Sequence, residues 1–300
     1  MISKLDPNPG VDAYVNYYQP PEPGAVPEKN DMALMLGDKD MVSHWMHIHD
    51  MRGREDEFSL DVQGFQSAKL HSKVADFQDA DEIKSTYYSE IQELVKRVTG
   101  ASRVLVYNHT VRTKPKNDFG DHVKGTYQGI EGPAPRIHVD QTPAGAESLL
   151  KFMFPDEADE VTKRGYQLIN IWRPLTPIRR DPLMVADMSK MSTSDLVPIP
   201  RSYYNNMTSA NFVCKYDGYG ATKSMREDDE TLIADGLSNG GEHSWWYIGG
   251  QEPDEALMFS CSDLRPGKRA NGTVHGSFSL PDQEGIPPRQ SVEVRVIAVF

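Results

Sequence analysis

Cysteine is scarce in this 300-residue chain, which contains only Cys214 and Cys261. Two cysteines cannot build a disulfide framework or a cysteine-rich zinc site, so we expect the fold to depend on its hydrophobic core. No run of about 18 apolar residues occurs, which excludes a membrane-spanning helix. The first ten residues also lack the apolar stretch of a secretory signal, and we therefore expect a cytoplasmic protein.

Positive charge is also in short supply. The chain carries 32 Lys and Arg against 44 Asp and Glu, which gives a net charge of −12. Proteins that bind nucleic acid neutralise phosphates with clustered Lys and Arg, so this balance argues against a nucleic-acid partner. The sequence also lacks a glycine-rich phosphate loop that opens a helix after a strand, which argues against a dinucleotide-binding or P-loop fold. These absences favour a protein that acts on or binds a small molecule.

Two helices are predicted, each with a residue that marks its start. In the first, Asp79 or Asp81 can cap the amino end, and Gly100 lies where a left-handed stop belongs. Its apolar residues recur at intervals of three and four and are Ile83, Tyr87, Ile91, Leu94, Val95 and Val98. The second helix opens with Thr142 as the cap and Pro143 in the first turn. We expect the first helix to cover a core formed by other elements.

Most of the other apolar residues are arranged as in strands. Runs of β-branched and aromatic residues are separated by clusters of Pro, Gly, Asp and Asn. The expected strands span residues 58–65, 103–112, 166–173, 183–188, 211–216, 244–248, 256–261, 272–278 and 291–299. Many short strands with such punctuation predict a mainly β protein with flanking helices, built as a sandwich, barrel or jelly roll.

The composition divides the chain into three parts. Residues 1–50 begin with a stretch rich in Pro, Gly, Asn and Asp, and we expect an extended arm packed on the body. Residues 51–300 are expected to form one domain. Within it, residues 189–243 have the weakest periodicity and several aromatic residues, among them Tyr203 and Tyr219. Long irregular segments of compact domains are commonly functional, so we expect an insertion that acts as a lid.

One histidine has an acidic residue at the spacing that a metal site needs. Of the nine histidines, only His138 is followed two positions later by an acid, Asp140. Residues i and i+2 of a strand project to the same side, so both side chains can reach one metal ion. Non-haem Fe(II) is commonly held by two imidazoles and one carboxylate, with the remaining positions open. A strand-end histidine beside a helix-capping aspartate is the plainer interpretation of the same pair.

The carboxyl-terminal part supplies a second histidine and a basic residue in the expected order. His275 lies on a β-like segment, and Arg289 opens the last predicted strand with Ser291 on the same face. The planar guanidinium of Arg289 can hold a carboxylate bidentately, and Ser291 can donate a further hydrogen bond. Arg295 also lies on that face and is the alternative anchor, or else the partner of an internal acid such as Asp187. An exposed arginine at the start of the strand is the plainer interpretation of Arg289.

The order His138-x-Asp140, His275 and Arg289-x-Ser291 resembles that of the Fe(II)/2-oxoglutarate-dependent dioxygenase superfamily. Four further segments are similar to the fungal gibberellin-desaturase group, which also contains cephamycin-hydroxylase-like and AsaB-type proteins. These segments are YNHTVR at 107–112, NIWRPL at 170–175, PDEALMF at 253–259 and SVEVR at 291–295. The likeness covers roughly residues 50–300, and its motifs are specific as a set.

This resemblance implies a double-stranded β-helix, the cupin-like jelly roll, that uses Fe(II), 2-oxoglutarate and O2. It implies hydroxylation or desaturation of a small secondary metabolite, with iron held by His138, Asp140 and His275. It assigns 2-oxoglutarate to Arg289 and Ser291. Because the spacing from His275 to Arg289 is longer than in plant-type members, Arg295 stays open as the anchor.

Four more residues are candidates for the pocket, and they are His109, Arg112, Asn170 and Arg173. His109 fits a core histidine bonded to the backbone equally well. Asn170 and Arg173 are an odd number of positions apart, so they lie on opposite faces of their strand and only one can face the cosubstrate. The remaining histidine cluster is more typical of a half-buried strand or turn than of a metal site, and it consists of His44, His47 and His49.

Two other functions stay open on the sequence alone. A cupin-like iron dioxygenase would need the metal but not 2-oxoglutarate, and activity that survives the loss of Arg289 would favour it. A jelly-roll binding protein with a vestigial site would bind no Fe(II).

Overall fold

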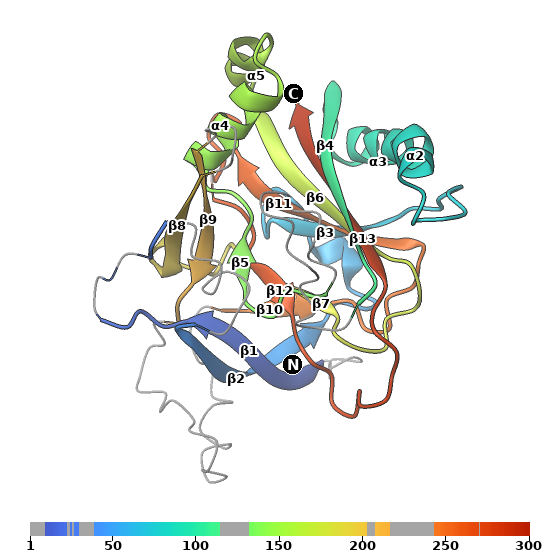
Figure 1. Ribbon diagram of the computed structural model, residues 1–300, viewed down its shortest axis with the longest axis vertical. Helices are drawn as coiled ribbons and strands as arrows, with labels where there is room; N and C mark the ends of the chain where they lie inside the picture. The colour runs from blue at the N-terminus through green and yellow to red at the C-terminus, as the bar shows by residue number, and fades with distance from the viewer. Residues whose placement is uncertain are drawn as a thin grey trace, which may run out of the picture.

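Two β-sheets form the body of the protein in the computed structural model (Figure 1). The structure describes residues 10–22, 25, 27–29, 39–114, 132–202, 208–216, 243–269 and 271–300. Strands outnumber helices in these residues, which confirms the predicted mainly β fold with flanking helices. Among the described helices, none is long and apolar enough to cross a membrane.

The larger sheet has eight strands, and several neighbours in it are distant in the sequence. In spatial order they are β1 (Val11–Tyr18), β2 (Met41–Asp50), β10 (Trp245–Tyr247), β7 (Leu183–Ala186), β12 (His275–Ser277), β5 (His138–Val139), β9 (Thr208–Cys214) and β8 (Leu196–Ser202). β10 runs parallel to β2, and the other neighbouring pairs are antiparallel. The order β7-β12-β5 brings three remote parts of the chain side by side.

The smaller sheet has five antiparallel strands, which are longer on average. In spatial order they are β3 (Phe65–Lys69), β11 (Glu255–Asp263), β6 (Tyr166–Pro174), β13 (Ser291–Val299) and β4 (Arg103–Arg112). The last strand of the chain, β13, lies between β6 and β4. Its position makes the carboxyl-terminal residues a central part of the fold.

The two faces of β13 differ in chemistry because successive side chains of a strand point to opposite sides. One face joins the hydrophobic cluster beneath helix α3 and carries Val292, Val294, Val296 and Ala298. The other face carries three buried or nearly buried polar residues at its start, Ser291, Glu293 and Arg295. This polar stretch faces the larger sheet and forms part of the candidate site.

Helix α3 (Tyr88–Thr99) lies beside β4 and β13 on the outer face of the smaller sheet (Figure 1). It continues from the short α2 (Ala80–Glu82) and a π-helical stretch, η2 (Ile83–Tyr87). The side chain of Asp79 accepts hydrogen bonds from the first free amides, and Gly100 ends the helix with a φ of 73°. Both predicted ends of this helix are confirmed.

Helix α4 (Pro143–Met153) begins at the predicted cap and is followed by α5 (Ala158–Arg164). The hydroxyl of Thr142 accepts a hydrogen bond from the amide of Gly145 at 3.0 Å. The amide of Thr142 itself donates to the carbonyl of Ala210 in β9 at 2.8 Å. These two bonds fix the turn that leads from β5 into α4.

The strand expected over residues 58–65 is wrong. After the short η1 (Glu55–Glu57), the chain turns at 59–64, and the strand β3 starts only at Phe65. The amides of residues 62, 63 and 64 all donate to the carbonyl of Ser59, and Gly64 has a φ of 91°. Such a tight turn depends on the left-handed conformation of Gly64, which interrupts the loose alternation of apolar residues.

The expected arm and lid fall only partly within the described residues. Of residues 1–50, the strands β1 and β2 pair with each other at one edge of the larger sheet. Of residues 189–243, the short η3 (Thr193–Asp195) and the pair β8–β9 are described. Tyr203 and Tyr219 lie outside the described residues, so the lid stays a prediction.

Candidate active site

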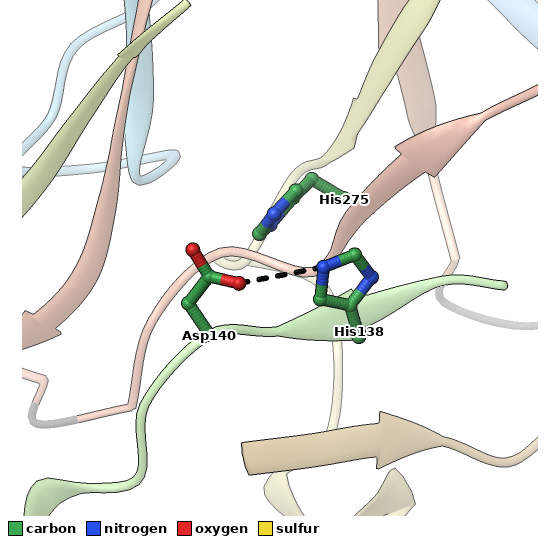
Figure 2. A group of neighbouring side chains, drawn as sticks. All are labelled: His138, Asp140 and His275. Carbon is green, nitrogen blue, oxygen red and sulfur yellow. Dashed lines mark ion pairs between the residues drawn. The ribbon is translucent and has the colours of Figure 1, made fainter. Parts of the chain in front are cut away.

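Three side chains with suitable ligand atoms lie together where β5 and β12 meet. His138 and His275 are opposite partners in the antiparallel register, and Asp140 follows in the turn toward α4. Their ligand atoms all lie within 4.8 Å of one another, and Figure 2 shows the side chains converging. In the described part of the chain, no other group of three or more His, Cys, Asp or Glu side chains is close enough to hold a metal ion.

Both imidazoles present the same ring nitrogen to the centre of this group. Nδ1 of His138 lies 2.9 Å from the carbonyl oxygen of Arg136, and Nδ1 of His275 lies 3.0 Å from that of Thr273. A carbonyl only accepts hydrogen bonds, so each Nδ1 carries the proton and each Nε2 keeps its lone pair. The backbone two residues earlier therefore selects the tautomer that a metal ligand needs.

His275 is held in its neutral form by burial. Only 3% of the residue is exposed, and its ring packs against Phe259 with the centroids 4.4 Å apart. Burial, and then the neighbouring His138, lower the pKa of His275 to about 4. At neutral pH this imidazole has no proton to lose before it binds a metal ion.

The carboxylate of Asp140 is fixed by two donors on one of its oxygens. Oδ2 accepts a hydrogen bond from Nδ2 of Asn170 at 2.8 Å and another from Nε of Arg295 at 2.9 Å. Burial raises the pKa of Asp140, but the charge of the Arg295 guanidinium outweighs it and holds the pKa well below its usual range. The other oxygen, Oδ1, lies 3.4 Å from Nε2 of His138 (Figure 2).

Each nitrogen of the Arg295 guanidinium has a partner inside the protein. Besides Asp140, its guanidinium forms an ion pair with Glu293 and donates to the hydroxyl of Thr110 at 3.0 Å. The suggested partner Asp187 is wrong, because its carboxylate instead accepts the amide and hydroxyl hydrogens of Ser189. Arg295 instead pairs with two acids: Asp140, in a turn distant in the sequence, and Glu293, on its own strand. The spacing of residues along the sequence does not indicate these pairs.

Arg289 and Ser291 have buried polar atoms that lack partners. Arg289 is 5% exposed, which excludes an exposed arginine at the strand start. Its Nη1 donates to the carbonyl of Asp181 at 2.6 Å, its guanidinium carbon lies 5.1 Å from the Trp172 ring centroid, and its Nε has no partner. The Ser291 hydroxyl also has no partner. Burial, followed by the charge of Arg112, lowers the pKa of Arg289 to about 9, a penalty that a bound carboxylate would relieve.

Two of the four further pocket candidates lie away from the triad. Nδ1 of His109 lies 2.7 Å from the hydroxyl of Tyr88, which belongs to helix α3. Arg173 donates to the carbonyl of Pro253, and its guanidinium lies 5.7 Å from the ring centroid of Tyr87 in η2. Both residues therefore belong to the helix side of the smaller sheet. Asn170, three positions before Arg173, points to the opposite side as its spacing predicts.

Three polar residues of the site were not singled out from the sequence. Glu293 completes a period-two polar run within an otherwise apolar strand, and that pattern is a usable signal. Thr110 contacts Arg295 from β4. Asn211 lies on the same face of β9 as Val213, which is opposite His138 in the strand register. The buried Oδ1 of Asn211 has no hydrogen-bond partner. The fourth pocket candidate, Arg112, donates to the carbonyl of Gly132 at 2.8 Å.

The histidine cluster of residues 44–49 lies on β2, as the half-buried strand interpretation predicts. Nδ1 of His47 lies 2.7 Å from Oδ1 of Asp12, and the ring of His49 stacks on Trp246 with the centroids 4.7 Å apart. These contacts give two of the imidazoles structural partners within the larger sheet.

The chain is similar to known proteins over nearly its whole length. Residues 15–300 match a family model described as oxidoreductase/YMDC permease-like domain. Oxidoreductase AN1597 of Emericella nidulans is 53% identical over 279 residues, which cover 93% of this chain and 92% of that protein. The alpha-ketoglutarate-dependent dioxygenase phiK of a fungal species is 31% identical over 297 residues, which cover 97% and 96%. The chain belongs to this Fe(II)/2-oxoglutarate-dependent dioxygenase family.

A solved structure shares the fold of this dioxygenase. A variant of the iron and alpha-ketoglutarate-dependent endoperoxidase NvfI matches with a TM-score of 0.73 at 21% identity, covering 97% of both chains. The likeness confirms the predicted jelly roll. Two imidazoles and a carboxylate fit a divalent iron, and the unpartnered atoms of Arg289 and Ser291 fit the distal carboxylate of 2-oxoglutarate.

Proposed function

We propose that this dioxygenase binds Fe(II) through Nε2 of His138, Nε2 of His275 and Oδ1 of Asp140. The observation that carries the proposal is the arrangement of these three side chains, in which backbone carbonyls occupy both Nδ1 atoms and two donors occupy Oδ2. The protein hydroxylates or desaturates a small secondary metabolite. When bound, Fe(II) and 2-oxoglutarate together activate O2 for removal of hydrogen from a substrate C–H bond.

The second part of the proposal places 2-oxoglutarate on Arg289 and Ser291. The guanidinium of Arg289 is positioned before any ligand binds, because the Asp181 carbonyl holds Nη1 and Trp172 lies against its face. A carboxylate at Nε and at the Ser291 hydroxyl would satisfy both atoms. The work of these residues is to orient the cosubstrate and to hold its distal charge in a buried site.

The site also needs a surface that excludes bulk water from the reaction. Phe259 packs on His275 from one side, and Trp172 underlies Arg289 on the neighbouring strand β6. Both rings are fully buried. They make the floor of the site apolar next to its charged groups, so that side chains and not solvent surround the bound cosubstrate.

The experiment combines metal binding with turnover of 2-oxoglutarate. Wild-type protein should bind Fe(II) under anaerobic conditions with about one ion per chain, and should convert 2-oxoglutarate to succinate in air. His138→Ala, Asp140→Ala and His275→Ala should each lose both properties while circular dichroism shows an intact fold. Full turnover by His275→Ala would contradict the proposed ligand set.

The same experiment separates the two alternatives. A cupin-like iron dioxygenase would bind Fe(II) but would oxidise its substrate without consuming 2-oxoglutarate, even after Arg289→Met. A binding protein with a vestigial site would bind neither Fe(II) nor 2-oxoglutarate. The buried, unpartnered Nε of Arg289 favours a 2-oxoglutarate-dependent enzyme over both alternatives.

A further inference from the structure

The two carboxylate oxygens of Asp140 have different surroundings. Oδ2 accepts hydrogen bonds from Asn170 at 2.8 Å and Arg295 at 2.9 Å, whereas Oδ1 faces the imidazole of His138 at 3.4 Å. One oxygen is thus turned toward the other metal ligands, and the other is turned toward the smaller sheet. This asymmetry bears on whether a metal ion would bind one carboxylate oxygen of Asp140 or both.

The two donors come from neighbouring strands and are held in place. Asn170 of β6 and Arg295 of β13 are opposite partners in the antiparallel register. Arg295 is further fixed by Thr110 of β4 and by the carboxylate of Glu293. Asn170 is fully buried. Neither donor can leave Oδ2 without losing a hydrogen bond in a buried place, where water does not replace it.

A carboxylate can bind a metal ion through one oxygen or through both. If Asp140 used both, it would occupy one more position of an octahedral ion than a facial triad does. The hydrogen bonds to Oδ2 oppose that change, and one of them comes from a charged donor, which makes it stronger than a neutral one.

We propose that Asn170 and Arg295 are positioning residues that reserve Oδ2 of Asp140, so that the metal receives Oδ1 alone. The site then keeps one coordination position open beyond those that 2-oxoglutarate takes. The inference rests on the proposed function, because it assumes that the three side chains hold the metal. It assigns Arg295 to the iron ligand and leaves the cosubstrate to Arg289.

The test uses Mn(II) as the probe, because water-proton relaxation reports how many exchangeable waters this ion keeps. With three protein ligands, Mn(II) in the wild-type protein should keep about three waters, and about one after 2-oxoglutarate binds. In Asn170→Leu, Oδ2 keeps only its bond from Arg295, and the metal ion should then compete successfully for this oxygen. The relaxation enhancement should then fall by roughly a third without 2-oxoglutarate, and nearly to the level of a water-free ion with it.

A second variant removes the charged donor together with its acidic partner on the same strand. Arg295→Gln combined with Glu293→Gln deletes both members of this ion pair, so Glu293 is not left without a cation, and the bound metal ion neutralises the carboxylate of Asp140. The matched control is Gln167→Met, which removes a buried amide from the opposite face of β6. The control should leave Mn(II) affinity and relaxation at wild-type values.

The sign of the change in metal affinity decides the result. Reservation of Oδ2 predicts that Mn(II) binds the Asn170→Leu protein at least as tightly as wild type, while one water is lost. A fall of about 10–100-fold in affinity would mean that Asn170 merely orients a ligand, and it would overturn the inference. Unchanged water numbers in both variants would overturn it as well. If wild-type protein bound no Mn(II) or Fe(II), the proposed function itself would fail.

Discussion

Arg289 and Arg295 lie on the same side of the chain's last segment, yet they meet different charges. Arg295 contacts Asp140 and Glu293, whereas Arg289 has a carbonyl, an aromatic face and an unpartnered Nε. A buried guanidinium without an acid partner is costly unless a ligand supplies one. The difference in partners, and not the spacing from His275, is what supports the proposal that Arg289 holds the cosubstrate.

The first prediction isolates the distal carboxylate of 2-oxoglutarate. Wild-type protein should bind 2-oxoglutarate more tightly than 2-oxopentanoate, which has the same chain length but lacks that carboxylate. Arg289→Met should reduce this preference by about 10–100-fold, because a charge-assisted hydrogen bond contributes about 1.5–3 kcal/mol. Calorimetric titration of the Mn(II) form measures both affinities.

Ser291→Ala should reduce the same preference by a smaller factor. Asn170→Leu is the matched control, since it alters the metal side of the site and should leave the preference intact. If Arg295→Gln with Glu293→Gln abolished the preference and Arg289→Met did not, the anchor would be Arg295.

The second prediction concerns stability and pH. Burial lowers the pKa of His275 to about 4, so between about pH 6.5 and pH 4 the unfolded chain binds a proton that the folded chain does not. The folded state is therefore fully favoured above pH 6.5 and loses stability as the pH falls toward 4. The loss for the metal-free protein should reach about 3 kcal/mol, measured by urea unfolding at several pH values.

His275→Gln is the control, because glutamine has no proton to gain in this range. Its unfolding free energy should vary less between pH 6.5 and 4 than that of the wild type. An equal slope in both proteins would show that His275 does not contribute to the pH dependence.

Among the described secondary-structure elements, two α-helices begin with a side-chain cap, and these two caps lie at different distances from the site. Thr142 caps α4 directly after Asp140, while Asp79 caps the helix on the outer face of the smaller sheet. Both caps should stabilise their helices by a similar amount. Only the first also fixes the turn that positions Asp140, a proposed metal ligand.

The third prediction compares these caps. Thr142→Ala and Asp79→Ala should each lower the unfolding free energy by about 1 kcal/mol, measured with urea. Thr142→Ala should also weaken Mn(II) binding several-fold, because the turn at Asp140 loses a constraint. Equal Mn(II) affinity in both variants would show that the bond from the Thr142 amide to Ala210 suffices to hold the turn.

The elements that the sequence predicts well have local causes. Asp79, Gly100 and Thr142 mark helix ends through hydrogen bonds within one turn. The strands β4, β6 and β13 contain runs of apolar residues that predict a strand without knowledge of the neighbouring strands. The segment 58–65 fails for the opposite reason, because a turn centred on the carbonyl of Ser59 competes with a weak alternation. The spacing of apolar residues does not predict a turn that is formed by backbone hydrogen bonds.

At the scale of the whole molecule, the site draws on segments that only the fold brings together. The pattern His138-x-Asp140 is local and could be found in the sequence, and His275 follows from its order along the chain. The partners Asn170, Glu293 and Arg295 depend on which strands are neighbours and in which register. Strand order is a property of the complete sheet, so the sequence offered Arg295 as an anchor but not as the partner of Asp140.

The place of β13 between β6 and β4 also bears on how the enzyme is made. Translation proceeds from the amino end, so a growing chain contains His138 and Asp140 long before His275, Arg289 and the central strand of the smaller sheet. The nascent polypeptide therefore lacks both the second imidazole and the strand that would enclose the proposed iron site. The proposed redox-active centre therefore cannot assemble before the segment from His275 to the end of β13 has been synthesised.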